Sequence, residues 1–161
     1  RMDDAADPTG RRTIEAHADA ARIALIAASF RRVTGQNLVP PGDDPATAMW
    51  TAPRVILAHG TEADPVFFYG NRMALDLFET TAADLIRMPS RYSAEPMERG
   101  ERARFLGDVA ARNFIADYSG IRIARSGQRF RIAQATVWNL LDADGAIRGQ
   151  AACFDRWEML S

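Results

Sequence analysis

Apolar residues recur at helical spacing in the first part of the chain, between Thr13 and Thr34. They form one stripe, which consists of Ile14, Ala18, Ala21, Leu25 and Ala28, widened by Ile26, Phe30 and Val33. Thr13 is a suitable cap and Gly35 stands where helices usually end, so we predict an amphipathic helix over 13–35. We expect its alanine-rich apolar face to be buried, either against its own domain or against a second copy of the chain. The polar residues 1–12 are expected to form a disordered tail.

Two short apolar runs follow, and both are typical of buried strands. They are RVILAHG (54–60) and VFFYG (66–70), separated by the turn TEADP. So short a connection predicts an antiparallel hairpin. Asp44 and Pro45 predict a short helix just before it, with the aspartate as cap and the proline in the first turn.

The period changes back to helical at the corner Gly70–Asn71. The Asn71 side chain suits a helix N-cap, and apolar residues then lie on one helical face, at Met73, Ala74, Leu77 and Phe78. A further short helix is predicted within TTAADLIRMP, capped by Thr80 or Thr81. A longer one is predicted within SRYSAEPMERGERARFLGDVAARN, capped by Ser93 or Glu95.

The last part of the chain is predicted to be three strands joined by hairpins. Ser126–Gly127 and the segment 142–145 are the turn signals. With the first hairpin, this gives an α+β fold with a five-stranded antiparallel sheet covered by helices on one face. The segment QATVWNLL fits two registers of the strand 128–141, or a bulge. The sequence therefore leaves open whether Trp138 faces the core.

Composition narrows the function classes. The 161 residues carry a net charge of -1, which gives no general attraction to nucleic acid or to a membrane surface. One cysteine allows no intrachain disulfide, and no apolar run reaches membrane-spanning length, so we expect a cytoplasmic protein. All 20 basic side chains are arginine, which excludes chemistry that needs a Schiff-base or phosphate-loop lysine.

The order of elements, with YGN leading into RMALDLF, resembles a PAS domain. Four segments together are similar to the MEKHLA domain, a PAS-related family, over residues 20–157: HGTEADPVFFYGNRMALDLFE, MPSRYSAEPMERGERARFL, DYSGIRIARSGQRFRIAQATVWNLLDADG and GQAACFDRW. The resemblance implies a curved sheet with helices over its concave face, a PAS-like domain over 36–161, and a bacterial stand-alone form. The family also occurs at the C-terminus of plant homeodomain-zipper regulators.

In a PAS-like arrangement, the corner at Asn71 lies at the rim of a space between sheet and helices. The candidates for its apolar lining are Tyr69, Met73, Leu77, Phe78, Leu85, Ile86, Tyr92, Phe105, Ile123, Ile132 and Trp138. The candidate polar groups that would orient a small ligand are Asn71, Arg91, Tyr92, Asn139 and Gln150. Two interpretations remain open: a solid core at crystal-like density, or a ligand cavity.

Other site chemistries have weaker support in the sequence. His59 is expected to bond to loop backbone or to Asp64 rather than to bind a metal, and no metal site is predicted. Cys153 is expected to be buried and unreactive. Flavin photoreceptors of the PAS family carry a reactive cysteine after the first hairpin, where this chain has MPSRYSAEP, so no flavin adduct is expected.

Haem is not expected either, because the predicted helical layer offers methionines but no histidine as axial ligand. The cofactor is otherwise unknown. Around Ser126–Gly127, the arginines Arg122, Arg125, Arg129 and Arg131 are interleaved only with Phe130, which is too few aromatic residues for nucleic-acid binding.

These expectations favour a non-enzymatic sensory or regulatory module. It would bind a small apolar or amphipathic molecule, a protein partner, or both, and signal through the N-terminal helix, which is also the expected homodimer contact. A pure interaction domain with a packed core is the alternative. A small enzyme that uses His59 is the third possibility. The sequence names neither ligand nor partner, and no attached output segment is recognisable.

Overall fold

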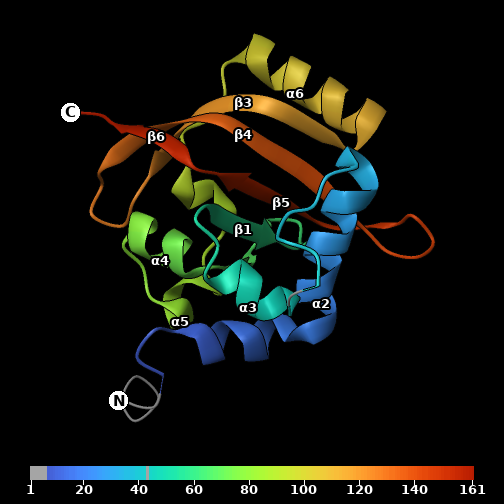
Figure 1. Cartoon of the computed structure of the whole chain (residues 1–161). Coiled ribbons are helices and arrows are strands. Elements are labelled where there is room, and N and C mark those ends of the chain that lie inside the picture. Colours follow the sequence, from blue (N-terminus) through green and yellow to red (C-terminus); the bar gives the residue numbers. More distant parts are fainter. Residues whose placement is uncertain (1–6, 43) are drawn as a thin grey trace.

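An antiparallel sheet with the strand order β2-β1-β5-β4-β3 forms the centre of the protein (Figure 1). The computed structural model describes residues 7–42 and 44–161. The strands along this path are β1 (Val55–His59), β2 (Phe67–Gly70), β3 (Phe114–Ile123), β4 (Arg129–Leu141) and β5 (Ile147–Phe154). The three predicted hairpins are present, so the antiparallel α+β fold is confirmed.

A further strand, β6 (Arg156–Met159), was not predicted from the sequence. It pairs with the first half of β4, with Ala133 opposite Arg156, while β5 pairs with the second half, with Thr136 opposite Cys153. The two pairings have the same register, so β6 continues the line of β5 along β4 after an interruption at Asp155. Its four residues, RWEM, alternate polar and apolar, but so short a run with no turn signal in front of it cannot be told from the end of β5 by sequence.

Helix α3 (Pro45–Trp50) precedes β1. Four helical elements connect β2 to β3: α4 (Arg72–Phe78), α5 (Ala82–Leu85), the 3-10 turn η1 (Ser90–Ser93) and α6 (Arg99–Arg112). The predicted caps are Asp44, Asn71 and Thr81. Each side chain accepts a hydrogen bond from the backbone N–H three residues later, at Thr47, Ala74 and Asp84 respectively. These local predictions are confirmed.

The predicted caps of the longer helix, Ser93 and Glu95, are wrong. Glu98 caps α6 by accepting from Gly100 N and Glu101 N. The earlier residues are engaged elsewhere, because the Ser93 hydroxyl donates to Ser90 O and Glu95 N donates to Ile121 O on β3. The chain at Ala94 and Glu95 therefore lies beside β3 before the helix begins.

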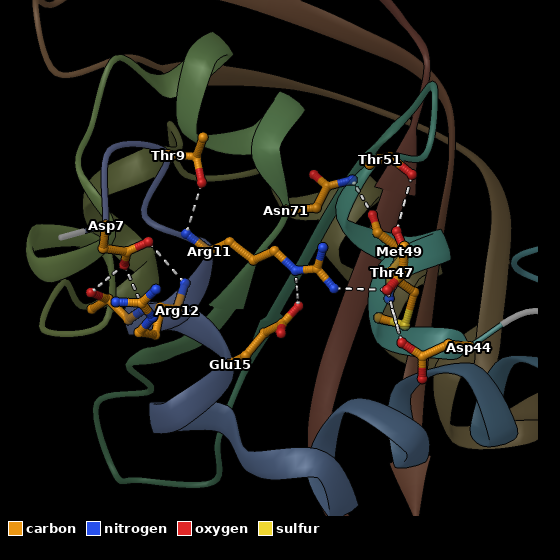
Figure 2. Close-up of polar contacts among 11 residues, drawn as sticks. Asp7, Thr9, Arg11, Arg12, Glu15, Asp44, Thr47, Met49, Thr51 and Asn71 are labelled. Atoms are coloured by element: carbon orange, nitrogen blue, oxygen red, sulfur yellow. Dashed lines mark hydrogen bonds and ion pairs between the residues drawn. The ribbon is translucent and has the colours of Figure 1, made fainter.

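The N-terminal helix, α2 (Arg11–Thr34), begins before the predicted Thr13. The Asp7 carboxylate accepts from the backbone N–H groups of Arg12 and Thr13, at 3.0 and 2.7 Å. Residues 7–12 of the expected tail are thus anchored, which corrects the prediction there; residues 1–6 lie outside the described part. Figure 2 shows how α2 is held against α3, with the Arg11 guanidinium between the Glu15 carboxylate and the Thr47 hydroxyl.

A break at Asp19 divides α2 into two segments. Asp19 has φ 67° and ψ 164°, a conformation outside the helical region. Its carboxylate accepts from Arg22 N and so caps the second segment, while the Arg22 guanidinium donates to Ala18 O and His17 O at the end of the first. The first segment runs along the lower edge of the domain in Figure 1 and the second rises along its right side.

The break changes which residues of α2 face inward. Ile14, Ile23, Ile26 and Phe30 are buried and share one hydrophobic core with the sheet, so the domain itself covers the apolar side of this helix. The predicted alanine stripe is not continuous: Ala18 is buried, but Ala21 and Ala28 are exposed.

The two faces of the sheet carry different helices. Side chains of successive strand residues point to opposite faces, so Val137 and Trp138 on β4 face opposite ways. Trp138 Nε1 donates to Ile26 O, and its ring meets the Phe30 ring edge-on at 4.8 Å, which places α2 on that face. Beside Gln134, which has φ 54°, the pairing of β4 with β3 shifts by one residue between Tyr118 and Gly120, which is a bulge in β4. The observed pairing settles the register that the sequence left open.

No helix within 7–42 or 44–161 is both long enough and apolar enough to span a membrane.

Candidate functional site

A cleft of about 430 Å³ lies on the face of the sheet opposite to α2. Its floor comes from the three central strands, where Leu57 and Val137 both pair with Ala152 in the register. Because cross-strand partners point to the same face, these three side chains form one apolar row across β1, β5 and β4. Phe154, two residues further along β5, extends the floor.

The segment Ser90–Met97 and helix α6 form the wall over this floor. Phe105 of α6 meets Tyr118 of β3 edge-on, with ring centroids 5.4 Å apart, and both rings line the cleft. Gly120 makes room for this arrangement, because a Cβ there would lie 2.6 Å from the Tyr118 hydroxyl oxygen. The wall is therefore fixed to the sheet by aromatic contact on one side and by Glu95 N donating to Ile121 O on the other.

A polar row closes one end of the cleft. Gln150 pairs with His59 on β1 and with Asn139 on β4, and Gln150 and His59 line the cleft. Gln150 Nε2 donates to Asn139 Oδ1, and Asn139 Nδ2 donates to Asn113 Oδ1. His59 Nδ1 donates to Gly60 O at 2.9 Å, which confirms the predicted bond to loop backbone.

Charged side chains lie around the rim of the cleft. Arg91 is paired with Asp64, both oxygens of which lie 3.1 Å from its Nε. Glu95 accepts from Arg129 Nε, and this bond lowers the pKa of the Glu95 carboxyl, so it stays ionised. Arg102 and Arg122 also line the cleft, and neither forms an ion pair within the described part of the chain.

The structure brings only some of the predicted site residues to this cleft. Phe105, Gln150 and Arg91 line it, and Asn139 accepts a hydrogen bond from Gln150 from the neighbouring strand. Asn71 does not: it is fully buried, and both of its side-chain atoms are used in hydrogen bonds to backbone.

The remaining predicted residues lie elsewhere in the fold. Trp138 faces α2, and Phe78 packs on Phe130 at 5.3 Å, near the buried Ile132. Tyr92 is 56% exposed and its hydroxyl accepts from Arg91. Partly buried positions outside the cleft are occupied by Met73, Leu77, Ile86 and Ile123. Leu85 packs over Gly70 in the core.

Tyr69 is a separate case, because it is fully buried on β2. Its hydroxyl has no hydrogen-bond partner among the described residues, and burial raises its pKa. It does not reach the cleft.

Sequence reasoning missed most of the floor. Leu57, Val137, Ala152 and Phe154 lie on predicted strands but were not singled out as lining. Their alternate positions in paired strands are the available signal, since residues that share a cross-strand row share a face. To use this signal, the register of the central strands must be known, and the segment QATVWNLL leaves that register ambiguous in the sequence.

The single cysteine does not face the cleft. Both neighbours of Cys153, Ala152 and Phe154, line the cleft, so its own side chain points to the other face. It is buried, and burial raises the pKa of its thiol, while Arg54 donates to the sulfur at 3.6 Å. No group of three or more metal-ligating side chains occurs in the described ranges.

Comparison with known proteins assigns a family to this architecture. A sequence model of the MEKHLA domain family matches residues 20–159. The chain belongs to this family. Among similar curated proteins, the rice (Oryza sativa) homeobox-leucine zipper protein HOX29 is 26% identical over 84% of this MEKHLA chain, and HOX10 is 26% identical over 94% of it. The chain spans only 16% of HOX29 and 19% of HOX10. Because these relatives are plant proteins, they give no support to the expected bacterial source.

Solved structures show that the MEKHLA chain has the PAS fold. An RNA-binding light-oxygen-voltage receptor aligns with a TM-score of 0.58 and 18% identity, over 72% of this chain and 34% of that one. A PAS domain from Colwellia psychrerythraea aligns with a TM-score of 0.56 and 11% identity, over 71% of this chain and 92% of that one. A light-oxygen-voltage domain studied with a flavin analogue aligns with a TM-score of 0.55 and 13% identity, over 74% of this chain and 87% of that one. At these identities the likeness concerns the fold alone.

Proposed function

We propose that this MEKHLA chain is a non-catalytic, cytoplasmic sensory or regulatory module that binds a small amphipathic molecule in the cleft over β1, β5 and β4. The observation that carries the proposal is the cleft itself, with an apolar floor between a polar row and a charged rim. Its volume of about 430 Å³ falls within the range of small-molecule sites, roughly 300–1,000 Å³. A pure interaction domain with a filled interior would leave no such space on this face.

The proposed signal is a shift in population between two packings of the sheet. Adjacent residues of one strand serve both faces, since Val137 lines the cleft and Trp138 holds α2. A ligand that prefers one position of α6 and β4 would change how tightly the second segment of α2 is held. The relatives named as homeobox-leucine zipper proteins are consistent with a regulatory role, by analogy only.

Native mass spectrometry of the freshly purified chain, compared with its denatured mass, tests the ligand directly. We expect extra mass that disappears on denaturation. In the variant Ala152→Phe, a phenyl group grows from the floor into the cleft, so the extra mass should be lost. Ala116→Phe adds the same group at an exposed position of β3 outside the cleft and should retain it. Equal ligand content in the two variants would contradict the proposal.

The N-terminal helix remains the proposed contact for a homodimer. In the second segment of α2, Ala20, Ala24 and Ala28 are exposed at four-residue steps, so they share one helical face. Small side chains there allow a second helix to approach closely.

We expect Ala24→Arg to convert a dimer to a monomer in analytical ultracentrifugation, because two guanidinium groups would face each other across the contact. Ala116→Arg is the matched control and should leave the dimer intact. Deletion of 1–34 is a poorer test, since it removes Ile26 and Phe30 from the core. A dimer that persists in Ala24→Arg would place the contact elsewhere.

A further inference from the structure

We infer that the cleft selects an anionic amphiphile, whose carboxylate, sulfonate or phosphate is held by Arg102 and Arg122 while its apolar body lies on the floor of the sheet. This inference rests on the proposed function and narrows its ligand to one chemical class. The observation behind it is an imbalance of charge: two arginines without carboxylate partners in the described chain border an apolar cavity.

Arg122 is positioned by the strand that carries it. It stands on β3 four residues after Tyr118, and its guanidinium carbon lies 5.6 Å from the centre of the Tyr118 ring. A cation over an aromatic ring is held through the face of the guanidinium, so its N–H donors remain available in the plane. The backbone of Arg122 is also bridged to Ala94, which fixes its distance from the wall of the cleft.

Arg102 approaches the same end from the helix. α6 is joined to β3 through the single residue Asn113 and runs back along it, with Arg104 near Asp117 and Phe105 on Tyr118 (Figure 1). In this antiparallel arrangement, a residue earlier in α6 lies beside a residue later in β3. Arg102 therefore extends from the Phe105–Tyr118 contact toward Arg122, and both line the cleft.

The other charged groups of the cleft balance one another. The Arg91 charge is matched by Asp64, and the Glu95 charge is matched by Arg129. The remaining charge at the rim is thus that of Arg102 and Arg122, both positive. Planar guanidinium groups bind carboxylate and phosphate groups through paired hydrogen bonds, which suits an anionic head.

The floor suits the rest of such a molecule. The row Leu57, Ala152 and Val137, followed by Phe154, separates the end of the cleft at Arg122 from the polar end at His59 and Gln150. An amphiphile would therefore lie along the strands, with its anion at Arg122 and its apolar body over the row.

Two fluorescent probes with the same aromatic body test separately whether the cleft binds an apolar body and whether Arg102 and Arg122 bind an anion. 8-Anilinonaphthalene-1-sulfonate carries an anion, and N-phenyl-1-naphthylamine is the same body without it. Both should bind the wild-type chain, the sulfonate more tightly, and only the sulfonate should weaken as salt is added. Arg122→Gln and Arg102→Gln should each lower the affinity for the sulfonate about tenfold and leave the neutral probe unchanged.

Arg72→Gln is the matched control, because this exposed arginine of α4 forms no ion pair in the described chain and lies outside the cleft; it should change neither affinity. Ala152→Phe should displace both probes. If the sulfonate binds equally well to wild type and to both arginine variants while Ala152→Phe displaces it, the anion inference fails and the proposed function stands. If neither probe binds, or Ala152→Phe displaces neither, the proposed function fails as well.

Discussion

Asn71→Ala is expected to lower the free energy of unfolding by about 3–5 kcal/mol, because four backbone groups would lose their partner in a fully buried place. Asn71 Oδ1 accepts from Ile56 N and Ala74 N, both at 3.1 Å. Its Nδ2 donates to Met49 O at 2.9 Å and to Arg54 O at 2.8 Å, the first of which is drawn in Figure 2. One side chain thus joins β1, α3 and the start of α4.

Chemical denaturation measures this loss of unfolding free energy, and Thr81→Ala is the reference variant with which it is compared. Thr81 also caps a helix, but at an exposed site and through one bond to Asp84 N, so its removal should cost about 1 kcal/mol. A loss for Asn71→Ala no larger than that for Thr81→Ala would contradict the structural role. Probe binding in the cleft should be retained by Asn71→Ala wherever the variant is folded, since Asn71 does not line it.

The predicted elements that the structure confirms are those with signals close by in the sequence. Asp44, Asn71 and Thr81 cap helices because their side chains reach a backbone N–H only three residues away, which a sequence can show. The hairpins around 126–127 and 142–145 likewise depend on turn residues next to one another.

The elements that failed depend on contacts between distant residues. Glu95 looked like a cap, but its carboxylate is bound by Arg129 and its backbone by Ile121, both on other strands. The helical period of α2 continues through Asp19 in the sequence, yet the chain turns there so that its two segments pack on different parts of the domain. Periodicity over 13–34 cannot show such a change of direction.

The site was less predictable than the fold, because a cavity is defined by which face a residue takes. Of the residues predicted to line a space between sheet and helices, Phe105 and Gln150 border the cleft. Trp138, which the sequence predicts to line the same space, faces α2 instead, because β4 contains one extra residue relative to β3 at the bulge beside Gln134. The sequence predicts Asn71 both as a helix cap and as a ligand group, and its four hydrogen bonds to backbone leave only the first role.

Trp138→Ala is expected to cost about 3–5 kcal/mol of unfolding free energy and to loosen α2 from the sheet. The indole is fully buried, its Nε1 donates to Ile26 O at 3.2 Å, and its ring packs edge-on against Phe30. Trp138→Phe keeps an aromatic ring but loses the hydrogen bond and some volume, so we expect a smaller loss, about 1–2 kcal/mol.

Hydrogen–deuterium exchange of Trp138→Phe then locates the effect. The amides of the second segment of α2, residues 20–34, should exchange faster, while those of α6 on the opposite face should change little. Affinity for N-phenyl-1-naphthylamine should also remain, because the indole lies behind the floor of the cleft and not in it. Faster exchange in α6 with α2 unchanged would mean that Trp138 faces the cleft. The route proposed here from Val137 through β4 to α2 would then fail with it.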